Sequence, residues 1–187
     1  MIPIYEQGKG RGIGHNLASF LDRFDKICQE HIKNNGAKAF AFIFYNFTDE
    51  DLRRILKDQG TFAKLDRLSG TNLSLFYLHS GGRETVRRFN ERFLKELGVI
   101  ENAAPPCVVF FKLKKEHIED VAIAALDSAD LLHGFQELYD VIERYIQSDV
   151  NQTAHGLHSL KWLKSGAGFI ALEVFRVILR NGLNLLF

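Results

Sequence analysis

APPCVVFFKL (residues 104–113) and VAIAALD (residues 121–127) place the strongest constraint on the topology of this chain. Both stretches are apolar and of strand length, and only a short polar segment separates them. Two parallel neighbouring strands need a connection of about a dozen residues or more. These two strands are therefore predicted to form an antiparallel hairpin.

The residues before this hairpin alternate between strand and helix patterns. AFAFIFYNF (39–47) is apolar throughout, which is typical of a strand buried on both faces of a parallel sheet. Residues 2–5 and 72–80 are the other predicted strands, and residues at helical spacing follow each strand. Two of the predicted helices begin after N-caps at Asn16 and Thr48. Two more cover residues 84–97 and 129–146. The first three strands are predicted to be parallel, because helices connect them.

The composition is that of a folded globular protein. Of the 187 residues, 46% are hydrophobic and 25% are charged, which fits one domain plus an appendage. The formal net charge of +1 gives no electrostatic reason to expect nucleic acid as a partner. Cys28 and Cys107 have no disulfide-framework or zinc spacing, and residues 1–10 lack the apolar run of a signal peptide. A reduced, cytoplasmic protein is expected.

The order of elements, with Pro106 directly before CVVFF, resembles the thioredoxin-like superfamily. The resemblance covers residues 1–147 and implies an α/β fold with a central mixed β-sheet flanked by helices. Residues 148–187 would then be a C-terminal helical extension. The resemblance also implies a cis peptide bond before Pro106, and places Pro106 and Cys107 at the surface that the family uses as its active site.

The sequence departs from this family where the family carries its reactive dithiol. The family's dithiol lies just after the second strand, at the start of the next helix. The corresponding residues here are FTDEDL (47–52), which contain no cysteine, so thiol–disulfide exchange by the usual route is excluded. The acidic residues Asp49, Glu50 and Asp51 are explained by the first turn of a helix. Cys107 has apolar neighbours that raise a thiol pKa, so it is expected to be a core residue, as is Cys28. The expected function is that of a redox-inactive interaction module rather than an enzyme, with no cofactor.

GKGRGIGH (8–15) is a second candidate functional segment, because its glycines and cations could form an anion-binding loop. It lacks the third glycine of a dinucleotide fingerprint and the GKS or GKT of a Walker loop. The favoured interpretation is a turn from the first strand into the first helix, either flexible or in contact with a partner. The alternative is an enzyme or ligand-binding protein that holds a phosphate-bearing or other anionic small molecule on this loop. The candidate ligand-binding residues are Gly8, Lys9, Gly10, Arg11, Gly12, Gly14 and His15.

The last segment, GFIALEVFRVILRNGLNLLF (168–187), predicts a helix that is apolar around about two-thirds of its circumference. Such a helix must be covered on two sides: by the sheet domain and the preceding segment, by a second copy in a dimer, or by another protein or a membrane surface. Its narrow polar stripe disfavours the membrane surface. Homodimerisation or docking on a protein partner is preferred. The candidate interface residues are Leu172, Phe175, Ile178, Leu179, Leu183 and Leu186.

Three further patterns are given structural interpretations. The mixed charges of residues 83–96 are typical of a solvated helix face. Residues 151–165 are expected to form a short helix. His155 and His158 in that segment have the spacing of two metal ligands, but no third ligand adjoins them, so no metal site is predicted.

Overall fold

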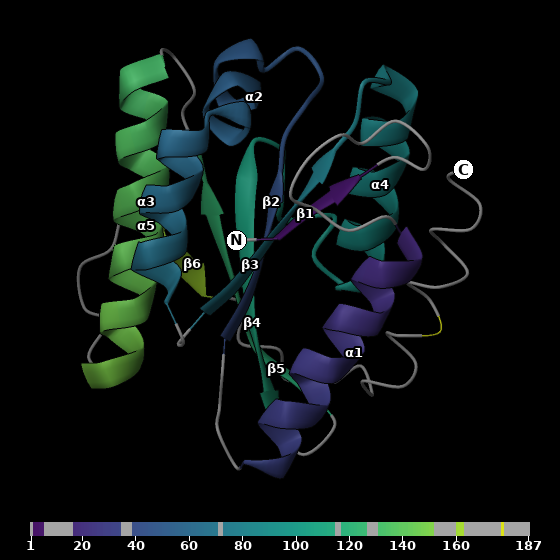
Figure 1. The fold of residues 1–187 in the computed structure, drawn as a ribbon, viewed down its shortest axis with the longest axis vertical. Helices are drawn as coiled ribbons and strands as arrows, with labels where there is room; N and C mark the ends of the chain where they lie inside the picture. The colour runs from purple at the N-terminus through teal and green to yellow at the C-terminus, as the bar shows by residue number, and fades with distance from the viewer. Residues whose placement is uncertain are drawn as a thin grey trace.

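The computed structural model describes residues 2–5, 17–34, 39–70, 73–114, 117–126, 131–151, 160–162 and 177. These residues form a mixed α/β structure in which helices cover both faces of one sheet (Figure 1). The strands are β1 (Ile2–Tyr5), β2 (Ala39–Phe44), β3 (Leu73–His79), β4 (Cys107–Lys114), β5 (His117–Ala125) and β6 (Leu160–Trp162). The helices are α1 (Leu17–Lys33), α2 (Glu50–Lys57), α3 (Gln59–Ser69), α4 (Arg83–Glu96) and α5 (Leu131–Asn151).

The sheet has the strand order β1-β3-β2-β4-β5-β6. Strand β3 pairs with β1 and β2, both in parallel, whereas β4 pairs with β2 and β5, both antiparallel. The predicted parallel strands and the predicted hairpin are therefore confirmed. In the register of β2 and β4, Phe44 lies opposite Cys107. The segment that follows β2 and the segment that precedes β4 therefore lie next to each other, at the same end of these two strands.

Strand β6 corrects the prediction of a helix over residues 151–165. Residues 160–162 pair antiparallel with Ala122–Ala124 of β5. The outer edge of a strand carries unpaired backbone N–H and C=O groups, and a further strand satisfies them. Local sequence gives little sign of this pairing, because the partner strand lies more than thirty residues earlier in the chain.

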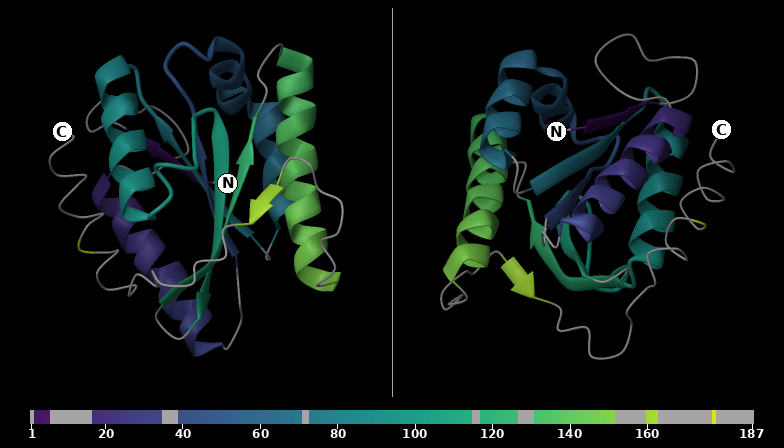
Figure 2. Two further views of the ribbon diagram at one scale, coloured as in Figure 1. Left: turned by 180° about the vertical axis from the view of Figure 1, so that it is seen from behind. Right: turned by 60° about the horizontal axis from the view of Figure 1, so that its bottom comes forward.

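The helices form two layers. Helices α1 and α4 lie on one face of the sheet, and α2, α3 and α5 lie on the other (Figures 1 and 2). Helix α5 packs against both α2 and α3. Thr48 was predicted to be the N-cap of the helix that follows β2. The N-cap of α2 is instead the next residue, Asp49. A second cap follows at Asp58, whose carboxylate accepts a hydrogen bond from the Thr61 backbone N–H at 2.7 Å and begins α3.

The core is built around β2, as its uninterrupted apolar sequence predicts. All six residues of β2 are buried. The ring of Phe42 contacts those of Phe76 and Phe93, each with centroids 5.3 Å apart, and that of Phe111 at 6.0 Å. These rings come from β3, α4 and β4, so a single side chain of β2 joins three elements.

We expect Phe42→Ala to lower the free energy of unfolding by about 3–5 kcal/mol, because it removes a fully buried ring and leaves a cavity. Urea denaturation monitored by circular dichroism measures this loss. Ile100→Ala is the matched control, because Ile100 is 46% exposed and its truncation should cost less than about 0.5 kcal/mol. Equal losses in the two variants would contradict this account of the core.

Candidate functional site

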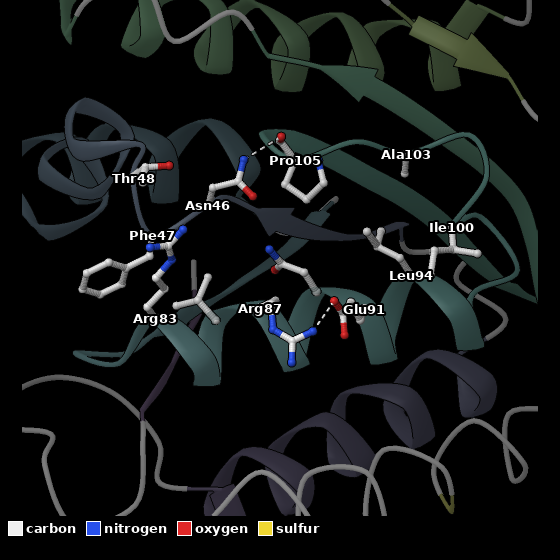
Figure 3. A pocket seen from close by; sticks show the side chains of 12 residues that line it. Asn46, Phe47, Thr48, Arg83, Arg87, Glu91, Leu94, Ile100, Ala103 and Pro105 are labelled. Carbon is white, nitrogen blue, oxygen red and sulfur yellow. Dashed lines mark hydrogen bonds and ion pairs between the residues drawn. The ribbon is translucent and has the colours of Figure 1, made fainter.

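A pocket of about 370 Å³ lies at the carboxyl end of β2 (Figure 3). Three parts of the chain form it: the β2–α2 connection, one side of α4, and the segment between α4 and β4. Its lining comprises Asn46, Phe47, Thr48, Arg83, Val86, Arg87, Asn90, Glu91, Leu94, Ile100, Ala103 and Pro105. The pocket borders residues 47–52, the stretch in which the family resemblance places a dithiol.

Hydrogen bonds fix the wall of the pocket that carries the proline residues. The peptide bond between Pro105 and Pro106 is cis, as expected for this position. The side-chain Nδ2 of Asn46 donates to the carbonyl oxygen of Pro105 at 2.8 Å (Figure 3), and the backbone N–H of Leu126 donates to that of Pro106 at 2.9 Å. The two prolines are thus bonded to the ends of β2 and β5.

The side chain of Phe47 is held by an arginine of α2. The guanidinium carbon of Arg53 lies 3.9 Å from the centroid of the Phe47 ring, a cation–π geometry. Arg53 Nη1 also donates to the Phe47 carbonyl oxygen at 3.0 Å. The first residue of the FTDEDL stretch is therefore a fixed aromatic side chain at the rim of the pocket.

The side of the pocket formed by α4 carries charges of both signs. Arg87 pairs with Glu84 at 2.6 Å and with Glu91 at 2.5 Å. Hydrogen bonds from Arg87 and then Arg88 lower the pKa of the Glu84 carboxyl to about 2. Arg83, in contrast, makes no hydrogen bond or ion pair with any described residue. The charged face of residues 83–96 is exposed as predicted, but two of its arginines also line the pocket.

Two buried polar residues support the floor of the pocket. Asn90 is only 6% exposed, and its Nδ2 donates to the carbonyl oxygen of Tyr45 at 2.9 Å. The Tyr45 hydroxyl donates in turn to the carbonyl oxygen of Leu78 at 2.6 Å. Burial raises the pKa of Tyr45 to about 12, despite the opposing effects of Arg53 and of the Ser80 backbone. Tyr45 thus stays protonated near neutral pH and connects β2 to β3.

Both cysteines of the chain are in the core, as expected. Cys28 and Cys107 are each 0% exposed, and neither forms a disulfide. Burial raises the pKa of the Cys107 thiol to about 12. Cys107 lies directly after the cis proline, but its sulfur does not line the pocket. A thiolate nucleophile is therefore not available at this site near neutral pH.

Several predicted site residues lie outside the described residues. These are the glycine-loop candidates Gly8, Lys9, Gly10, Arg11, Gly12, Gly14 and His15, and the interface candidates Leu172, Phe175, Ile178, Leu179, Leu183 and Leu186. His155 and His158 also lie outside them. Within the described part of the chain, no cluster of His, Cys, Asp or Glu side chains could hold a metal ion. No described helix is both long enough and apolar enough to cross a membrane.

Sequence reasoning missed the polar lining of the pocket. One signal was present: Asn90 is a polar residue on the inward stripe that Val86, Phe89 and Phe93 define. A buried asparagine on an apolar stripe needs a hydrogen-bond partner, which here is the end of β2. The contribution of Arg83 could not be found this way, because it depends on the distance between α4 and the β2–α2 connection.

No family model, curated protein or solved structure matches the chain.

We expect neither thiol of the native protein to react with Ellman's reagent at pH 8 within minutes, and both to react after unfolding in guanidinium chloride. The reagent attacks thiolates, and burial both hides the sulfur atoms and keeps Cys107 protonated. The Cys28→Ala variant serves as the control that assigns any residual reaction. Native Cys107 reacting at the rate of a free cysteine would contradict this description of the site.

Proposed function

We propose that this chain is a redox-inactive thioredoxin-like domain that acts as an interaction module. In this proposal the binding surface is the pocket at the end of β2. The strand order, the cis peptide bond before β4 and the placement of helices on both faces of the sheet all support the thioredoxin-like assignment.

The observation that carries the proposal is an open pocket whose lining contains no thiol, in a chain whose two thiols are both buried. The chain has two cysteines, both fully buried, and the pKa of Cys107 is raised to about 12. The pocket nevertheless has a volume within the range of about 300–1,000 Å³ that is usual for ligand sites. The surface is thus suited to contact without sulfur chemistry.

The lining favours binding over catalysis. Its only carboxylate, Glu91, is paired with Arg87 at 2.5 Å, and it contains no histidine or cysteine. General acid–base catalysis needs a titratable group that is poised to exchange a proton with the substrate. The remaining lining residues offer apolar surface, amide groups and the Arg83 guanidinium, which pairs with no described residue; these are groups that recognise a partner.

Photo-crosslinking from the pocket rim tests this role. We expect p-benzoylphenylalanine at position 100 or 48 to yield protein adducts in cells that produce the chain, because both positions are exposed lining residues. Position 67, which is exposed on α3 on the opposite face of the sheet, is the control and should yield none. Equal adduct formation from all three positions, or none from any, would refute the pocket as the binding surface.

The C-terminal segment is a second contact in this proposal, through the apolar helix that the sequence predicts over residues 168–187. The truncation that tests this contact must end after β6, so that the strand is kept. We expect a chain that stops after Lys164 to keep β6 and its stability but to lose self-association, measured as a lower mass by light scattering. A chain that stops after Asn151 also lacks β6, exposes the edge of β5, and should unfold at a lower urea concentration. An unchanged mass and solubility after the first truncation would count against this contact.

A further inference from the structure

One side of the pocket changes from charged to apolar along α4. Positions 83, 87, 90 and 94 follow helical spacing along one side of α4, and all four residues line the pocket. At a rise of about 1.5 Å per residue, the first and last of them are about 16 Å apart along the helix axis. A ligand that contacts the whole stripe must therefore be extended.

The charged end of the stripe is Arg83. Its guanidinium has no partner among the described residues, whereas that of Arg87, one turn later, is held between two glutamates. In Figure 3 the Arg83 side chain points from α4 toward the connection that carries Phe47 and Thr48. Arg83 is thus the cation of the pocket that is available to bind a carboxylate.

The middle of the stripe presents a hydrogen-bond acceptor. The Nδ2 of Asn90 is committed to the Tyr45 carbonyl oxygen, which fixes the orientation of the amide. No donor among the described residues reaches Asn90 Oδ1, and this oxygen is not sealed from the space of the pocket. A side chain that is 6% exposed rarely leaves its oxygen unpaired, so a donor from a ligand would complete this site.

The other end of the stripe is apolar. Leu94 and Ala103 are buried beneath it, and Ile100 stands at the rim with 46% of its surface exposed. Half of the lining residues are exposed, so the pocket is a groove on the surface rather than an enclosed cavity. An open groove of this length suits a polypeptide segment better than a compact small molecule.

We propose that the groove binds an extended peptide segment of a protein partner that carries an acidic and an apolar side chain on the same face. The carboxylate pairs with Arg83, a backbone N–H donates to Asn90 Oδ1, and the apolar side chain packs on Leu94 and Ile100. Successive residues of an extended segment alternate between faces at about 3.3 Å per residue, so two side chains that reach both ends of the stripe are four or six positions apart. This proposal rests on the proposed interaction function and adds the chemistry of the partner.

Fluorescence anisotropy with the full chain tests it. The probes are dye-labelled, capped heptapeptides in which Glu and Leu are four or six residues apart, in both orders. We expect at least one to bind, and its affinity to fall tenfold or more with Arg83→Gln or with Glu→Gln in the peptide. Arg67→Gln on the opposite face is the matched control and should leave the affinity unchanged. Ile100→Asp should weaken the same peptide, because it places a charge at the apolar end.

A double-mutant cycle between Arg83→Gln and the Glu→Gln peptide isolates the ion pair, since the two losses are then not additive. Additive losses would overturn the assignment of Arg83 to the carboxylate. Binding of octanoate in the absence of any peptide binding would assign the groove to a small molecule and overturn the proposal. If the peptides fail while crosslinks from positions 100 and 48 persist, the peptide chemistry is wrong and the interaction function stands. If both fail, the interaction function fails as well.

Discussion

The structure depends on β2, which lies between a parallel neighbour and an antiparallel neighbour and is buried along its whole length. Its phenylalanines pack with rings from β3, β4 and α4, so the strand joins both halves of the sheet to one helix layer. A strand that is buried on both faces is typically apolar along its whole length, as β2 is. The first exposed residue after it, Asn46, marks the point at which the chain reaches the surface.

The candidate site is built on this rigid strand end. Asn46 binds the carbonyl oxygen of Pro105, Asn90 binds that of Tyr45, and Arg53 binds that of Phe47. Three side chains from three different segments thus satisfy three carbonyl groups that no sheet partner reaches. The hydrogen bonds that satisfy these backbone carbonyl groups near the end of β2 also set the shape of the groove. The side chains that stabilise this end of the sheet are therefore also those that shape the proposed binding surface.

The sequence predicts much of the fold because the decisive patterns are local. The apolar run of β2, the helical stripe of Phe24, Ile27 and Cys28, and the short connection between β4 and β5 each act over a few residues. Strand β6 could not be predicted this way, because it depends on the free edge of β5. One predicted cap, at Thr48, stands where the structure has two helices, because the Asp58 cap that begins α3 lies within a stretch of helical apolar spacing.

The candidate site was less predictable than the fold. The cis peptide bond and the burial of both cysteines followed from the sequence and the family resemblance. The groove itself did not, because its walls come from three segments whose separation is a property of the packed structure. The i, i+4, i+7 spacing of Arg83, Arg87 and Asn90 became meaningful only once α4 was placed beside the end of β2.

The sealing of both sulfur atoms has a consequence for the conditions under which this protein can work. Neither cysteine side chain is exposed to peroxide or to glutathione, so the folded chain has no covalent cysteine state that follows the oxidant level around it. Under the proposed function, binding therefore needs no reductase and does not change with the oxidant level while the chain stays folded.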